Sequence, residues 1–401
     1  MVMRVSESMK YSTMIDNLYK VQSSYNELME KMASGKSLNR PSDDPLGMSR
    51  VLDYRESKAS IEQYRENIDS SKGWLTMTES VLSSVNDLLI NAKEIAISQS
   101  TATASAETRS IAVVSVEQLI DEMLSLANSQ YGDRYLFSGT KTSSDAPFSA
   151  AEVPATIGTP AAASGNTFDG TVAAGGGPYT GAVNKTYVVK IVTGGNFAAA
   201  EYQVSDDGGA TWGVVRNDLD TGTITLGDGI DFTFTAGTVD LAIDDIFHVD
   251  ANVEGYYKGN GEELSVAIGK NIHFDYSIPG QSVFTDQGDG AVDIFKTLND
   301  LKNALEANDP DAISSQMNNL DDGIQQVNKY IAQCGTRTNR LEIAETNLSD
   351  LDYKLTELIS NTEDVDLAEI VTKFSMKEVV LKASYQMASS IGNLSIIDFL
   401  R

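Results

Sequence analysis

The chain has 401 residues and carries 57 acidic against 30 basic side chains, which gives a net charge of −27 at pH 7. Such a charge repels nucleic-acid phosphates and anionic lipids, because both are recognised mainly through Lys and Arg. The longest apolar runs span only a few residues, far below the roughly 20 that a transmembrane helix needs. The first residues also lack the apolar core of a secretory signal peptide. We therefore expect no nucleic-acid partner and no membrane insertion.

Residues that could support catalysis or hold a metal are few. Cys334 is the only cysteine, so neither an intrachain disulfide nor a cysteine-based zinc site can form. The two histidines, His248 and His273, have no ligand-like spacing, and no phosphate-binding or dinucleotide-binding fingerprint occurs. We predict that Cys334 packs as a small apolar residue on a helix seam. The sequence therefore favours a protein that is not an enzyme and has no cofactor.

Acidic pairs and tryptophans are the other candidate binding residues. The acidic groups Asp206–Asp207, Asp244–Asp245 and Asp286–Asp293 do not match the calcium-binding loop of an EF-hand. We interpret them as solvated turns, because the whole surrounding segment is acidic. Trp74 and Trp212 are single aromatic residues, which we expect to be packing anchors rather than a sugar-binding platform.

Glycine and proline divide the chain into three parts. Of the 31 glycines, 25 lie between Gly132 and Gly290, and no proline occurs between Pro45 and Pro147 or after Pro310. Both residue types disfavour helix interiors, so the flanks can form long helices and the middle cannot. We predict a mainly α fold with a β insertion, in which a long coiled-coil helical bundle from the two flanks carries an inserted all-β domain.

The first predicted helix carries one narrow apolar stripe whose spacings alternate between three and four residues, as in a coiled coil. The stripe consists of Tyr11, Met14, Leu18, Val21, Tyr25, Leu28 and Met32. Gly35 follows where a left-handed helix cap is expected. Asp44 and Pro45 are then expected to cap and begin a second helix. Its seam comprises Ile61, Tyr64, Ile68, Ser71, Leu75, Thr78, Leu82, Val85, Leu89, Ala92 and Ala96.

A third helix is expected to stop near Gly132, and the middle segment then changes character. Alternation of β-branched or aromatic with polar residues predicts strands at 187–192 and 232–235, with a turn at 206–209. Between residues 140 and 290 there are 20 acidic and 6 basic side chains. We expect this β domain to present a solvated, charged outer surface, with glycan or host-surface binding as the alternative.

The second flank predicts three more helices. The first is short and bears Val292, Phe295, Leu298 and Leu301, and Asp309 with Pro310 is expected to begin the next. The seam of that long helix is Ile313, Met317, Leu320, Ile324, Val327, Ile331, Cys334, Thr338, Leu341, Ala344, Leu348, Leu351, Leu355 and Leu358. The last helical pattern is Met376, Val380, Ala383, Met387, Ile391 and Leu394.

The first and last apolar stripes are separated by almost the whole chain. A single helix with one narrow stripe buries too little apolar surface to be stable by itself. We therefore expect both ends to stay largely unfolded in the monomer until neighbouring molecules supply more apolar surface. The predicted assembly interface is Tyr11, Met14, Leu18, Val21, Tyr25, Leu28, Met32, Met376, Val380, Met387, Ile391, Leu394 and Ile397.

Four stretches of the chain resemble the flagellin superfamily. They are the turn MASGKSLNRPSDDP at 32–45, RYLFSGT at 134–140, GTRTNRLE at 335–342 and LSIIDFL at 394–400. The resemblance covers roughly residues 1 to 140 and 255 to 401. Within the superfamily, Pro41 and the run from Asp43 to Gly47 are similar to the branch found at the hook-filament junction, whereas filament subunits usually have a different first turn.

The resemblance implies a layered assembly. Residues 1–40 and 362–401 would form terminal helices of an inner tube layer, residues 41–139 and 291–361 a helical rod, and residues 140–290 a β-rich surface domain. It also implies export without a cleaved signal peptide, through the flagellar type III apparatus, to the extracellular flagellum. The expected partners are neighbouring copies, another hook-associated protein on the hook side, flagellin on the filament side and an export chaperone.

Two alternatives stay open at this point. Within the superfamily, the chain could be a flagellin, that is, a filament subunit instead of an adaptor that seeds flagellin polymerisation. Outside it, an intracellular coiled-coil signalling or scaffold protein would also show long apolar seams. The glycine-rich β segment between Gly132 and Gly290 counts against this second alternative.

Overall fold

The computed structural model describes residues 7–101, 103–142, 145–287 and 291–399, and the side chains of 7–8, 10–11 and 391–399 are outside this description. The chain divides into two compact units. The terminal unit consists of residues 1–65 and 345–401, and the central unit consists of residues 66–344.

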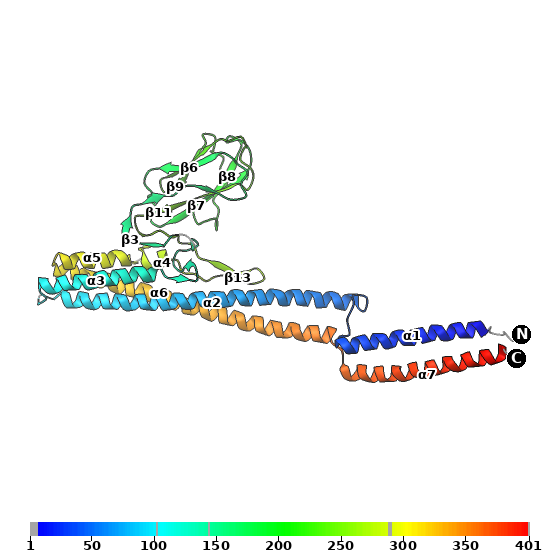
Figure 1. The fold of residues 1–401 in the computed structure, drawn as a ribbon. Coiled ribbons are helices and arrows are strands. Elements are labelled where there is room, and N and C mark those ends of the chain that lie inside the picture. The colour runs from blue at the N-terminus through cyan, green and yellow to red at the C-terminus, as the bar shows by residue number, and fades with distance from the viewer. Residues whose placement is uncertain (1–6, 102, 143–144, 288–290, 400–401) are drawn as a thin grey trace. The chain divides into compact units, whose positions relative to one another are not determined.

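Four helices make up the terminal unit, and two of them continue into the central unit. Their bounds are α1 (Glu7–Ser34), α2 (Pro45–Gln99), α6 (Pro310–Glu363) and α7 (Leu367–Phe399). α1 and α7, from opposite ends of the sequence, lie side by side (Figure 1). The described helices include none that is long and apolar enough to cross a membrane. The predicted mainly α fold with a β insertion is confirmed.

The predicted helix starts and stops are mostly confirmed. Gly35 has a φ of +70°, and its N–H donates to the Lys31 carbonyl at 2.9 Å, as a left-handed cap requires. Oδ1 of Asp44 accepts a hydrogen bond from the Leu46 amide at 3.1 Å where α2 begins. Oδ1 of Asp309 does the same for the first amides of α6.

The third helix is shorter than predicted. α3 (Ala106–Ala127) ends with an Asn128 cap, and the chain then forms the hairpin of β1 (Gln130–Tyr131) and β2 (Arg134–Tyr135). Gly132, with a φ of +63°, lies in the turn of that hairpin and not at the helix end. Gly132 therefore allows the hairpin turn, whereas the helix ends earlier, at the Asn128 cap.

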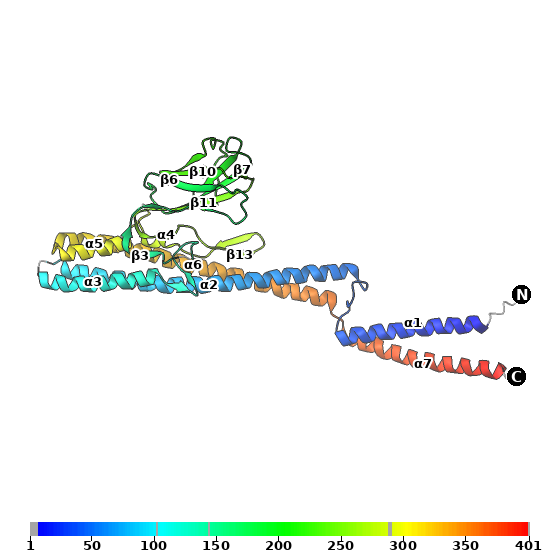
Figure 2. The ribbon, with the colours of Figure 1, turned by 45° about the horizontal axis from the view of Figure 1, so that its top comes forward.

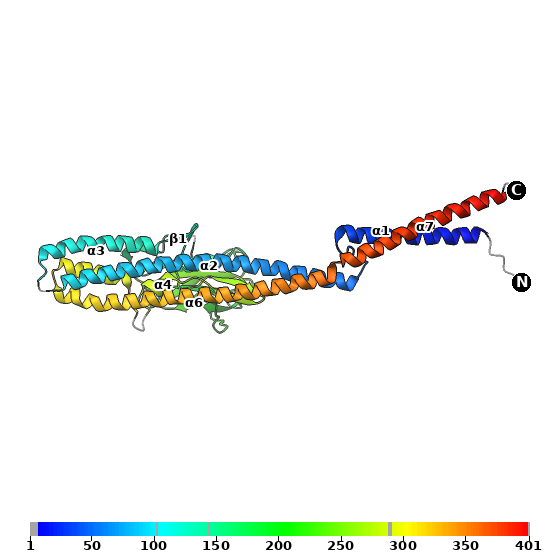
Figure 3. The same cartoon turned by 90° about the horizontal axis from the view of Figure 1, so that it is seen from below.

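In the central unit, α2 and α6 lie side by side, and α3 and α5 (Ile294–Glu306) pack together beside them (Figure 3). The predicted α2 seam is buried throughout, apart from a half-buried Tyr64. The predicted α6 seam is correct as far as Leu348 and again at Leu355, but Leu351 and Leu358 are exposed. Asp352 and Ile359 are half-buried in their place. Two successive spacings of four residues therefore separate Ala344, Leu348 and Asp352, which is a local departure from the heptad.

The inserted β region forms two antiparallel sheets over one core (Figure 2). One sheet has the order β6-β10-β9, and the other has the order β4-β11-β7-β8 with β5 paired to β11. Both predicted strands are confirmed, since 187–192 lies in β7 and 232–235 lies in β10. The strand bounds are β4 (Thr156–Ile157), β5 (Ala161–Ala162), β6 (Thr171–Gly176), β7 (Lys185–Thr193), β8 (Glu201–Ser205), β9 (Thr223–Gly227), β10 (Ile230–Thr235) and β11 (Ile246–Asn252).

Aromatic side chains from both sheets fill this core. Phe232, Phe234 and Phe247 are buried and meet edge to face, with the Phe234 and Phe247 ring centroids 5.1 Å apart. Such ring pairs stabilise a core beyond their buried area. Between this core and the helices lie one two-stranded sheet, one hairpin and one short helix inside the range predicted to be all β. They are β3 (Phe148–Val153) with β12 (Gly255–Tyr257), β13 (Ser265–Gly269) with β14 (Ile272–Asp275), and α4 (Gly280–Phe284).

Candidate assembly interface

The helices α1 and α7 meet through aromatic and polar contacts. The Tyr25 ring stacks on the Phe374 ring, with centroids 4.8 Å apart. The Tyr385 hydroxyl donates a hydrogen bond to Oε1 of Gln22 at 2.6 Å. Because these residues lie more than 340 positions apart in sequence, the contacts join the two ends of the chain into one helical pair.

The predicted stripe on α1 lies at this contact. All its members with a described side chain are half-buried, which are Met14, Leu18, Val21, Tyr25, Leu28 and Met32. The side chain of Tyr11 lies outside the described part of the structure. The α1 stripe therefore serves first as the surface that receives α7.

The predicted stripe on α7 lies elsewhere on its helix. Met376, Val380 and Met387 are exposed by 58%, 46% and 59%, and the side chains of Ile391, Leu394 and Ile397 are outside the described residues. The face that α7 turns to α1 instead carries Ile370, Phe374 and Leu381. α7 is therefore apolar on two faces, and α1 covers one of them.

Other apolar residues around α7 are exposed as well. They are Leu367, Val371, Val379 and Tyr385, whose hydroxyl bonds to Gln22 of α1. Near the chain ends, a hollow of about 520 Å³ opens between the two helices. It is lined by Met9, Thr13, Met14, Asn17, Leu18, Ser384 and Met387. An exposed apolar surface of this kind is typical of a protein-protein contact.

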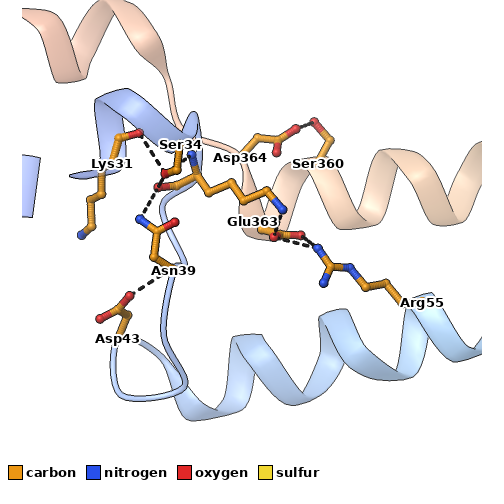
Figure 4. Close-up of polar contacts among 9 residues, drawn as sticks. Lys31, Ser34, Asn39, Asp43, Arg55, Ser360, Glu363 and Asp364 are labelled. Carbon is orange, nitrogen blue, oxygen red and sulfur yellow. Dashed lines mark hydrogen bonds and ion pairs between the residues drawn. The ribbon is translucent and has the colours of Figure 1, made fainter. Parts of the chain in front are cut away.

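At the root of the pair, the turn after α1 meets the joint between α6 and α7 (Figure 4). The Glu363 side chain is only 6% exposed and accepts hydrogen bonds from two cations. Lys36 Nζ lies 2.5 Å from one carboxylate oxygen, and one terminal nitrogen of Arg55 lies 2.8 and 2.7 Å from the two oxygens. We call Lys36, Arg55 and Glu363 the root triad.

Two backbone hydrogen bonds connect the same segments. The Ser37 amide donates to the Glu363 carbonyl at 2.7 Å, and the Val365 amide donates to the Gly35 carbonyl at 3.1 Å. They form an antiparallel bridge between Lys36 and Asp364. The bridge and the root triad together hold the end of α1 against the start of α7.

The run PSDDP at 41–45 shapes this turn. Oδ2 of Asp43 accepts hydrogen bonds from the amides of Arg40 and Asn39 at 2.9 and 3.0 Å. These bonds hold the pKa of the Asp43 carboxyl below its ordinary value. Gly47 permits the close return of the chain, since a Cβ there would lie 2.6 Å from Oδ2 of Asp44. The motif therefore closes the turn with one carboxylate and caps α2 with the next.

Comparison with known proteins agrees with this architecture. The family model for the bacterial flagellin N-terminal helical region matches residues 5–142. The model for the bacterial flagellin C-terminal helical region matches residues 317–400, so the two together cover more than half of the chain. The chain belongs to the bacterial flagellin superfamily.

Individual flagellar relatives match to different extents. The flagellar hook-associated protein 3 of Escherichia coli strain K12 is 33% identical over 148 residues, which cover 37% of this chain and 46% of that protein. The alignment thus spans less than half the length of this relative. A flagellin of Clostridium tyrobutyricum is 23% identical over 393 residues, which cover 96% of this chain and 98% of that protein. The solved structure of Bacillus cereus FlgL covers 77% of this chain and 99% of its own at 14% identity, with a TM-score of 0.42.

Candidate chemical residues of this flagellin-superfamily chain have structural roles. Cys334 is buried on the α6 seam as predicted, and burial, with the nearby Glu79 charge, raises the pKa of its thiol to about 12. Trp74 is buried between Tyr131 and Tyr276, which confirms a packing anchor. Trp212, by contrast, is 37% exposed, so the same prediction was wrong there.

The acidic turns are only partly solvated. Asp244 is exposed and pairs with Lys190 at 2.8 Å. Asp245 is buried, and its carboxylate accepts hydrogen bonds from the amides of Thr167 and Ala242. The interpretation of this pair as a solvated turn was therefore wrong for Asp245, which fixes two loops from inside. Among the described residues, no cluster of three or more His, Cys, Asp or Glu could hold a metal ion.

Proposed function

We propose that this chain is a structural, non-enzymatic component of the bacterial flagellum that assembles at the hook-filament junction. The observation that carries the proposal is the second apolar face of α7, with Met376, Val380 and Met387 exposed beside a completed contact with α1. Exposed apolar side chains gain stability only when another surface removes them from water. The name of the Escherichia coli relative supports the junction as the place of assembly.

In this proposal, the assembly interface is the predicted set of terminal residues, used in two ways. The α1 stripe packs on α7 within one subunit, and the α7 stripe packs on neighbouring subunits. The partners are copies of this chain, another hook-associated protein on the hook side and flagellin on the filament side, whose polymerisation the adaptor seeds. Contacts of this kind join different surfaces of successive subunits, so they generate rings or open helices.

The terminal helices are proposed to gain order during assembly. Residues 1–40 and 362–401 would be largely unfolded in the free chain, apart from the bridge between Lys36 and Asp364 at their root, and the helical pair of Figure 1 would be their assembled form. Circular dichroism of the full-length and the end-trimmed monomer tests this point. If trimming removes helical signal in proportion to the deleted residues, the ends were already folded and the proposal of ordering on assembly fails.

Export also belongs to the proposal. We expect the chain to leave the cell through the flagellar type III apparatus without a cleaved signal peptide, with a chaperone that covers the C-terminal segment until export. The uncovered apolar face of α7 supports the need for such a cover, because an exposed face of this kind promotes aggregation.

A filament subunit is the second candidate, because the Clostridium tyrobutyricum flagellin aligns with nearly the whole chain. Deletion of the gene followed by electron microscopy distinguishes the two. A junction adaptor predicts hooks without filaments and flagellin lost to the medium. A filament subunit predicts that its own polymer disappears and that no other flagellin accumulates in the medium. Normal filaments on normal hooks would contradict both.

A further inference from the structure

Glu363 has the one buried side chain of the root triad. That side chain is 6% exposed, whereas the Lys36 and Arg55 side chains are 41% and 47% exposed. A carboxylate removed from water is stable only when cations and hydrogen-bond donors replace its hydration. Glu363 therefore requires both of its partners to stay near the end of α6.

Each partner of Glu363 belongs to a different part of the chain. Lys36 lies in the turn that follows α1, Arg55 lies on α2, and Glu363 is the last residue of α6 before α7. The separations along the sequence are 327 and 308 residues. One buried charge thus connects the roots of both terminal helices to the α2 and α6 pair.

We infer that Glu363 is a positioning residue, which couples the two chain ends so that α1 and α7 leave the helical rod side by side and in fixed register. The Lys36 to Asp364 bridge is the backbone contact that this charge protects. The inference rests on the proposed function, because fixed register matters when both helices enter one assembly. Glu363 would align α1 with α7 within one molecule, whereas the exposed face of α7 would contact other molecules.

A second ion pair between α2 and α6 provides a matched control for Glu363. Lys58 of α2 and Asp352 of α6 form a 3.1 Å ion pair, with side chains 42% and 26% exposed. This pair also joins α2 to α6, but it touches neither terminal helix root. Asp352→Asn therefore removes one charge between the same two helices and leaves the root triad intact.

The test is hydrogen exchange of the full-length monomer, read at the amides of Ser37 and Val365, which form the bridge. Glu363→Gln preserves the shape of the side chain and removes its charge. We expect it to accelerate exchange at both amides at least tenfold, while Asp352→Asn changes them less than twofold. The amide of Leu82, in the middle of α2 and buried, should exchange at the same rate in all variants, which shows that the rod is still folded.

A double substitution separates charge coupling from simple packing. If Arg55 acts through Glu363, then Arg55→Gln added to Glu363→Gln should accelerate exchange no further, because both changes remove the same interaction. Additive effects would overturn the inference. So would unchanged exchange in Glu363→Gln, equal acceleration in Asp352→Asn, or a wild-type monomer in which neither amide is protected. These measurements do not depend on a flagellar location, so they can fail while the deletion experiment succeeds, or the reverse.

Discussion

The central rod and the terminal pair of α1 and α7 both carry apolar residues at spacings of three and four. These residues are buried to different degrees in the two regions. In the rod, Leu75, Leu82 and Val85 of α2 are completely buried. In the terminal pair, the corresponding stripe of α1 is only half-buried. More than half of the exposed large apolar side chains in the described structure lie in the terminal unit, although it holds less than a third of the chain.

The reason is the number of neighbours that each helix has. α2 packs beside α6 in the central unit, where α3, α5 and the hairpins add further apolar cover. α1 has α7 as its one long neighbour in the terminal unit. Two helices can bury one stripe each, and a second stripe stays in water unless another molecule covers it. The rod is thus complete within one chain, and the terminal pair is not.

The largest expected effect on stability comes from the rod. Leu82→Ala removes a fully buried side chain and should lower the free energy of unfolding by about 3 kcal/mol, because it loses apolar burial and leaves a cavity. Leu18→Ala in α1, where the side chain is only half-buried, should cost less than about 1 kcal/mol. Urea unfolding followed by circular dichroism measures both. Equal losses would show that the terminal pair is as well packed as the rod.

The same contrast explains which features could be predicted from the sequence. The α2 seam was predictable because its eleven positions repeat at spacings of three and four, although Trp74, Val81 and Leu88 beside it are buried as well. α7 carries apolar residues on several faces, and Ile370, Phe374 and Leu381 compete with the predicted Met376, Val380 and Met387. Periodicity alone could not show which set meets α1.

Contacts between residues far apart in the sequence could not be predicted from local sequence patterns. Asp43 and Asp44 could be predicted as a turn, because their partners lie within four residues. Glu363 was not singled out, since its two partners are more than 300 residues away in the sequence. The inward shift to Asp352 was missed for a related reason, because its ion pair with Lys58 depends on α2. Which side chain faces inward at such positions depends on the neighbouring helix.

An intermediate effect is expected at Asp293, which caps the first turn of α5 in the central unit. Burial, only partly offset by the Lys296 amide, raises the pKa of this carboxyl to about 6 from 3.8. Between these values the native chain holds a proton that the unfolded chain has lost, so the stabilising contribution is present at low pH and is lost as pH rises through 6. Asp293→Asn keeps a capping oxygen and stays neutral.

Asp293→Asn should therefore raise the free energy of unfolding by about 1 to 2 kcal/mol at pH 7 and change it little near pH 4. Urea unfolding at several pH values, with the difference taken between variant and wild type, isolates this group from the other carboxylates. A variant that is less stable at pH 7 would show that the ionised form of Asp293 is the one the fold prefers. The effect should be confined to the central unit and leave assembly unchanged, which separates it from changes in α7.

The smallest effect on the monomer should come from Val380→Asp, and this substitution tests the terminal pair most directly. Val380 is 46% exposed on the uncovered face of α7, so the free energy of unfolding should change by less than about 0.5 kcal/mol. In an assembly, the new carboxylate would be buried without a partner, which costs several kcal/mol and corresponds to at least about a hundredfold loss of incorporation.

Gln386→Asp places the same charge at another exposed position of α7 and serves as the control. Immunoblots of purified hook and filament preparations from complemented deletion strains measure incorporation. Normal incorporation of Val380→Asp would remove this face from the interface, whereas equal loss in both variants would assign the defect to the added charge and not to the position on the helix.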